Sequence, residues 1–269
     1  MALQPPPGAP ISPDGRWWWD GAAWQPMPPA GQPPPPTAPP APGLAPPPYR
    51  VASLRALFAV IGLGAVALTV LAGMGVDLYG ISIYATVGAG GRTLGQADAD
   101  YGLTALAWSV VFYLLYIPTI VLFCVWEHRA AANLPALGGR ELRFTPGWAV
   151  GWWFVPIANL FRPYQVMAEL WKASDPALDE TYRRQRQGLS TPLLLKLWWA
   201  AWIVGNVITN FSNRASFAAH DPTSNIGALV VDLAGSAITV AAAGLAILVV
   251  KNADARQVAK AARLGLSPR

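Results

Sequence analysis

Long apolar stretches dominate the sequence between residues 56 and 250. A helix that crosses a bilayer needs about 20 consecutive apolar residues. Charged residues make up only 12% of the chain, which is about half the share of an ordinary soluble domain. The sequence therefore predicts an all-α polytopic membrane protein, and so many long apolar segments disfavour a soluble helical bundle. The four predicted transmembrane helices are Ala56 to Val76, Leu103 to Trp126, Pro192 to Phe211 and Ile226 to Val250.

A fifth apolar stretch, Trp148 to Leu160, has only 13 residues and contains Gly151 and Pro156. This length is typical of re-entrant or interfacial segments. If the stretch does not cross, most Lys and Arg residues fall in the connection from Glu127 to Thr191 and in the C-terminal tail. Basic connections stay in the cytoplasm. We therefore expect a multi-pass plasma-membrane protein with four crossings and both termini cytoplasmic, and a five-crossing arrangement is the alternative.

Proline divides the chain into regions of different character. Thirteen of the 27 prolines fall between Pro26 and Pro48, which indicates an extended, disordered linker. We expect four regions: a Trp-rich head motif (1–25), a proline-rich linker (26–49), a membrane domain (50–250) and a basic cytoplasmic tail (251–269).

The tail can continue the last span as a helix. Arg256, Lys260 and Arg263 would then share one helix face. We expect this face to contact lipid headgroups or to be solvated.

Tryptophan dominates the head, where residues 11 to 26 read ISPDGRWWWDGAAWQP. Two Asp-Gly pairs flank the aromatic run and favour tight turns, so we expect a small β-like motif. In a strand, Trp17 and Trp19 face one way and Trp18 the other, and an aromatic surface stays exposed unless Trp24 or a partner covers it. These four tryptophans are candidate partner-binding residues. Stapling of a miniature fold and insertion at the membrane interface are the alternatives.

Two parts of the chain resemble known families. The stretch SPDGRWWWDGAAW is similar to the short tryptophan motif called domain of unknown function 2510, which actinobacterial membrane proteins often carry at one end. The segment from Trp126 to Ser174 resembles domain of unknown function 4328, and the resemblance extends over roughly residues 50 to 250. It implies a bacterial multi-helix membrane domain without an established activity. The resembling residues are Trp126, Arg129, Asn133, Pro146, Gly147, Trp148, Trp152, Trp153, Pro156, Asn159, Leu160, Arg162, Pro163, Tyr164 and Trp171.

Polar residues near a break in the chain form one candidate site. Pro156 and Pro163 interrupt helical structure on either side of Asn159. We expect the Asn159 amide to satisfy unwound backbone and Arg162 to reach a lipid phosphate. A substrate site at the break, as in transporters with discontinuous helices, is the alternative. The tryptophans expected to anchor this segment along one side are Trp148, Trp152 and Trp153.

A second candidate site lies in the outer half of the predicted bundle. Asn206 and Asn210 share a helix face, and Asp232 lies at a similar depth in the last span. We expect the three to meet. Asp232 is the best single candidate for a functional ionisable group, because an unpaired carboxylate is costly within a membrane. The alternative is that the asparagines only donate hydrogen bonds to the carboxylate and hold the two helices together.

The remaining composition disfavours several functions. The chain has one cysteine, Cys124, and no catalytic cluster, so we expect no metal, cofactor or catalytic residue. Glu127 and His128 are interpreted as ordinary solvated charges. The net charge of +5 comes from residues beside the apolar segments, which favours membrane lipids over nucleic acid as partners.

The sequence thus favours a non-enzymatic anchoring or interaction module that presents the head to a protein partner. A small transporter or channel that uses the polar residues of the bundle is the alternative. A homo-oligomer is left open.

Overall fold

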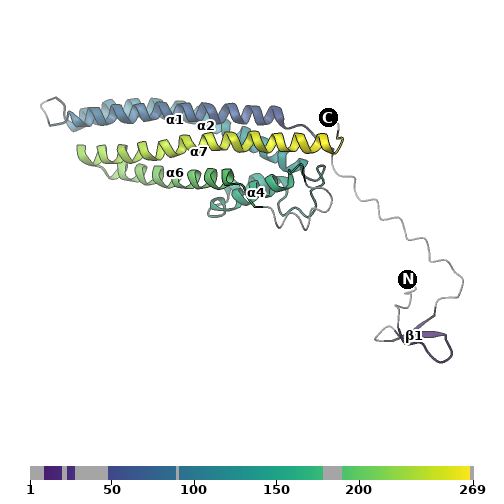
Figure 1. The fold of residues 1–269 in the computed structure, drawn as a ribbon. Coiled ribbons are helices and arrows are strands. Elements are labelled where there is room, and N and C mark those ends of the chain that lie inside the picture. Colours follow the sequence, from purple (N-terminus) through teal and green to yellow (C-terminus); the bar gives the residue numbers. More distant parts are fainter. Residues whose placement is uncertain (1–8, 20–22, 28–47, 89–90, 178–189, 267–269) are drawn as a thin grey trace. The chain divides into compact units, whose positions relative to one another are not determined.

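The computed structural model describes residues 9–19, 23–27, 48–88, 91–177 and 190–266 (Figure 1). The chain divides into two compact units, Met1–Pro46 and Pro47–Arg269. The first contains a small sheet and the second is helical. Most of the expected linker, residues 28–47, and the expected Asp20-Gly21 turn lie outside the described residues.

The head unit is built on two short strands. Strand β1 (Trp17–Trp19) pairs antiparallel with β2 (Trp24–Pro26), and Trp18 stands opposite Gln25. Before β1, the amide of Gly15 donates to the carbonyl of Ser12 at 2.9 Å, and Gly15 has a positive φ of 68°. That backbone conformation suits glycine because it has no Cβ. The predicted small β motif is therefore confirmed.

Four long helices form the second unit: α1 (Ser53–Ala85), α2 (Leu94–Asn133), α6 (Leu193–Ala218) and α7 (Pro222–Arg263). Helix α1 lies between α2 and α7, and α6 packs on the other side of α7 (Figure 1). Helices α1, α2 and α7 are long and apolar enough to cross a membrane. The third predicted span falls on α6, which is less apolar because it carries a lysine, an arginine, three tryptophans and three asparagines.

Glycines bring α1 close to α2 at successive levels. The pairs are Gly62 with Thr119, Gly73 with Trp108 and Gly80 with Tyr101. At Gly73 a Cβ would lie 2.5 Å from Cζ2 of the Trp108 indole. Small residues allow helices to approach closely and gain van der Waals contact, which is the main attraction between helices in lipid.

Between α2 and α6 the chain folds into short pieces: α3 (Pro146–Gly151), the single 3₁₀ turns η1 (Trp152–Phe154) and η2 (Ala158–Leu160), and α4 (Arg162–Ala173). None reaches the length of about 20 residues that a crossing helix needs. The stretch from 148 to 160 is therefore not a spanning helix, as the four-crossing arrangement requires.

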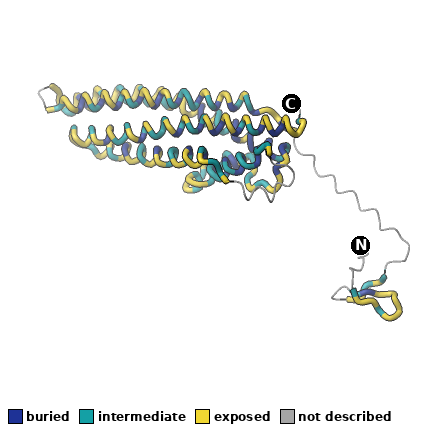
Figure 2. Tube along the Cα trace, viewed as in Figure 1, coloured by how far each residue is buried: buried dark blue, intermediate teal, exposed yellow. Residues whose placement is uncertain are grey.

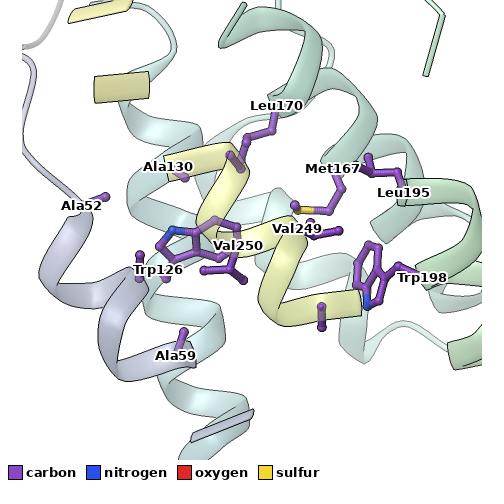
Figure 3. Packing of buried hydrophobic residues seen from close by; sticks show 13 residues of the cluster. Ala52, Ala59, Trp126, Ala130, Met167, Leu170, Leu195, Trp198, Val249 and Val250 are labelled. Carbon is purple, nitrogen blue, oxygen red and sulfur yellow. The ribbon is translucent and has the colours of Figure 1, made fainter. Parts of the chain in front are cut away.

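The largest apolar core lies where α4 packs between the ends of the long helices (Figure 3). Trp126 of α2 is fully buried there, together with Leu170 and Met167 of α4 and Val250 of α7. Away from this core, the long helices keep many exposed positions (Figure 2). Large apolar residues occupy many of these positions on α2.

The basic face of the tail docks onto the end of α4. Helix α7 continues without a break to Arg263. Arg256 pairs with Asp175 at 2.7 Å, and the Lys260 ammonium donates to the carbonyl of Ala173 at 2.8 Å. Arg263 donates to the carbonyl of Pro176. The expectation of a lipid-bound or solvated face is therefore wrong, because the Asp175 carboxylate and two carbonyls at and just beyond the end of α4 bind these cations.

Candidate functional site

The head exposes part of its tryptophan surface. Trp18 is 3% exposed, whereas Trp17 and Trp24 are 43% and 48% exposed. The indole of Trp24 meets that of Trp19 edge-on, with ring centroids 5.5 Å apart. The strand alternation predicted from the sequence is thus present, and it leaves an aromatic face beside a tryptophan that is already buried.

A pair of carboxyl groups lies between α1 and α7. The side chains of Asp77 and Asp232 interact directly, and Asp77 is only 7% exposed. The hydroxyl of Tyr101, on α2, donates to Oδ1 of Asp77 at 3.4 Å. Two adjacent carboxylates repel each other, so the pair requires a shared proton or a bound cation. In the described ranges, neither aspartate forms an ion pair with a lysine or arginine.

Hydroxyl groups surround Asp232. Ser212 and Ser236 lie beside its carboxyl group. The Ser212 hydroxyl also donates to the carbonyl of Ala228 at 2.8 Å, and this bond joins α6 to α7. Oδ1 of Asp232 is buried and has no hydrogen-bond partner among the described residues. The pair therefore keeps an acceptor free in an otherwise packed region.

The expected meeting of Asn206 and Asn210 with Asp232 is wrong. Both asparagines are exposed, and their amides donate at 2.8 Å to the carbonyls of Trp202 and Asn206, one turn earlier in α6. Asp77 takes their place. Sequence reasoning missed it because the first span was ended at Val76, whereas α1 continues for nine more residues. The apolar residues that follow Asp77 are the signal that places it within the helix.

Arg162 has a structural role at the break around Asn159. Its guanidinium lies 5.2 Å from the ring centroid of Trp152 and 5.6 Å from that of Phe161, and it donates to Gln165 at 3.1 Å. These contacts hold the start of α4 against η1. The amide nitrogen of the Asn159 backbone donates to the carbonyl of Val155 at 3.0 Å. Asn159 and Arg162 therefore stand at a structured turn.

The tryptophans of this segment do not share one side. The ring of Trp148 packs at a tilt against that of Trp152, but the turn η1 directs Trp153 inward, where it contacts Trp198, Trp199 and Trp202 of α6. The indole nitrogen of Trp153 donates to Oε2 of Glu127 at 2.7 Å. The expectation that Trp153 anchors at the interface with the other two is wrong, because the 3₁₀ turn changes the helical spacing.

Glu127 is completely buried, so its interpretation as a solvated charge is wrong. Nearby, Asn133 donates to the carbonyl of Arg50 at 2.9 Å and to Gln257 of α7 at 3.2 Å. Gln257 donates in turn to the carbonyl of Ala130 and to Ser174. This network fastens α2, α4 and α7 together at the end of the unit. Sequence patterns alone do not reveal it, since its partners are up to 127 positions apart.

The described residues contain no group of three or more His, Cys, Asp or Glu side chains placed to hold a metal ion. The pair of Asp77 and Asp232 contributes two carboxyl side chains, which is fewer than such a group requires.

Comparison with known proteins identifies a family. The model of the family described as domain of unknown function (DUF4328) matches residues 92–255, which include α2 to most of α7. No curated protein and no solved structure matches the chain.

Proposed function

The chain belongs to the family described as domain of unknown function (DUF4328), and we propose that it is a plasma-membrane anchor that presents a tryptophan head to a protein partner. The helical unit holds the chain in the bilayer with four crossings, and both termini lie in the cytoplasm. The head then acts at the cytoplasmic membrane surface.

The arrangement of the helices supports four crossings. Helix α6 runs antiparallel to α7, since Gly205 faces Thr239 and Gly235 faces Thr209. The entrance to α1 and the end of α7 lie at the same end of the unit, because Tyr49 and Ala261 both pack with Leu137. An even number of crossings places these two segments on one side of a membrane. Lys and Arg are concentrated at this end, as expected of a cytoplasmic face.

The exposed tryptophans are the observation that supports binding of a protein partner by the head. The head has its own core residue in Trp18, so Trp17 and Trp24 are not needed to fill that core. Exposed tryptophans are costly to hydrate and are enriched at protein interfaces. A head that exposes two of them has a surface suited to a partner.

Cross-linking of the full chain in cell membranes tests this role. A photoreactive amino acid in place of Trp24 is expected to give a discrete protein adduct, and the same group in place of Ser12 serves as the control on the same unit. Adding Trp17→Ala is expected to remove the adduct without changing membrane insertion. Adducts to lipid alone would show that the head inserts at the membrane interface, and the proposal that it binds a protein partner would then fail.

Accessibility of introduced cysteines tests the topology separately. On a Cys124→Ser background, single cysteines replace Arg92, Ser190 and Ser216 in turn. An impermeant thiol reagent added to intact cells is expected to label positions 92 and 216 only. Labelling at 190 would place the connection before α6 outside the cell and would contradict four crossings.

The carboxyl pair favours a second candidate function, which is movement of protons or a monovalent cation by an oligomer. Ionisable groups within membrane helices commonly mark ion pathways. Proteoliposomes with wild-type protein are expected to show a proton or sodium flux that Asp77→Asn and Asp232→Asn abolish. Asp98→Asn is the matched control, since Asp98 is an exposed acid near the same end. Equal flux in all four proteins would exclude this function.

A further inference from the structure

A groove with a basic end and apolar walls lies between α1, α2 and α3. Its volume is about 560 Å³. Arg55, His128 and Arg129 line one part of it. Val121, Val125 and Phe154 line another part, and all three are exposed. The groove is thus open to the surroundings of the helices and is amphipathic.

The arginines of the groove lack counter-charges. The charged groups that act on Arg129 are Arg55 and Arg50, which repel it. Within the described ranges, no carboxylate forms an ion pair with Arg55, His128 or Arg129. Nε of Arg129 is buried and has no hydrogen-bond partner there. The nearest buried acid on α2, Glu127, is engaged by Trp153. Such a cluster is stabilised by an anion that accepts hydrogen bonds from the guanidinium groups.

The apolar wall of the groove indicates what kind of anion it binds. Val121 precedes Arg129 by eight residues, so about 12 Å of helix separates the apolar end from the basic end. This is the distance over which a phospholipid passes from its phosphate into its acyl chains. The helix that carries both ends, α2, is one of those apolar enough to span a membrane.

We propose that the groove binds an anionic glycerophospholipid. Its phosphate lies at Arg55 and Arg129, and its acyl chains lie along Val121, Val125 and Phe154. A zwitterionic lipid fits less well, because among the groove residues no carboxylate is present to bind its ammonium group. The site is independent of the head and of the carboxyl pair.

Lipid titration of the purified full-length protein tests the site. Native mass spectrometry in a neutral detergent measures binding of dioleoylphosphatidylglycerol and of dioleoylphosphatidylcholine. The wild type is expected to prefer the anionic lipid. The double variant Arg55→Gln, Arg129→Gln is expected to bind it about 30-fold more weakly, since each basic residue contributes about a fivefold gain in affinity near anionic lipid. Lys251→Gln, an exposed cation at the same end of the unit but outside the groove, is expected to change binding less than about twofold.

A filling variant tests the groove with its charges intact. Gly147 lines the groove, and a Cβ there would meet no atom within 4 Å. Gly147→Phe is therefore expected to fold and to lose the lipid. In the wild type, the only cysteine of the chain, Cys124, also lines the groove. Phosphatidylglycerol, but not phosphatidylcholine, is expected to slow its reaction with a membrane-permeant maleimide.

Several results would overturn the proposal. Equal affinity for the two lipids, or Lys251→Gln acting as strongly as the double variant, would show only general attraction to charge. Competition by inorganic phosphate at similar concentration would identify a site for free phosphate. Unchanged binding by Gly147→Phe would place the lipid elsewhere. If the double variant does not fold, the filling variant and the Cys124 reaction decide the matter.

Discussion

The indole nitrogen of Trp153 donates a hydrogen bond to Oε2 of Glu127 at 2.7 Å, and this bond joins η1 to the end of α2. Glu127 is fully buried and its other oxygen has no hydrogen-bond partner among the described residues. Both residues belong to the segment from Trp126 to Ser174, which carries the resemblance to the family. Their contact shows that this segment folds back on itself around a buried acid.

Trp153→Phe is expected to destabilise the protein by about 1–3 kcal/mol, because it leaves a buried carboxyl group without its donor. Thermal unfolding in detergent measures the loss. Trp148→Phe is the matched control, since Trp148 is exposed and its indole donates no described hydrogen bond. Equal losses in the two variants would show that ring size matters and the hydrogen bond does not.

Gly73→Ala is expected to destabilise the contact between α1 and α2 by about 1–3 kcal/mol, which is typical of overpacking. The Trp108 ring has little freedom to move, because its indole nitrogen donates to the carbonyl of Thr69 at 2.9 Å. Gly75→Ala on the same helix meets no atom within 4 Å and is expected to stabilise the helix by up to about 1 kcal/mol. Chemical unfolding of both variants checks the difference in sign.

Ile157→Gly is expected to stabilise the protein in detergent. Ile157 has a positive φ of 65° and a side chain that is 75% exposed. Relief of backbone strain gains about 1–3 kcal/mol, and the greater chain entropy of glycine costs about 0.5–1 kcal/mol. Leu160→Gly, with ordinary backbone angles, is expected to destabilise. A lower melting temperature for Ile157→Gly than for the wild type would contradict the strain.

The start of α7 is expected to lose stability in acid. The hydroxyl of Ser224 and the amides of Ser224 and Thr223 donate to Asp221 and lower the pKa of this carboxyl group below its ordinary value of 3.8. Because the folded state has the lower pKa, the contribution is complete above that ordinary value and disappears as the pH falls through the folded-state pKa.

Hydrogen exchange measures this effect at residues 222–229. Protection in the wild type is expected to exceed that in Asp221→Ala most strongly near neutral pH, and the difference is expected to shrink below about pH 4. A difference that stays constant with pH would show that the Asp221 side chain caps the helix without its negative charge.

Much of the helical unit was predictable from the sequence. Three predicted spans fall within α1, α2 and α7, since their long apolar runs constrain the backbone to helices wherever water is absent. The alternation of Trp17, Trp18 and Trp19 likewise follows from strand geometry. Boundaries were less accurate. Ending the first span at Val76 left Asp77 out, and with it the partner of Asp232.

The sequence by itself determined the long apolar helices, the aromatic strand and the short length of the stretch from 148 to 160, because these depend on local composition and spacing. Only the tertiary structure decided which polar groups meet. Asp77 reaches Asp232, Trp153 reaches Glu127 and Arg256 reaches Asp175 across many positions of the chain. The first contact depends on the rotation and depth of two packed helices, α1 and α7, and the other two depend on how the chain between α2 and α6 folds back against the long helices.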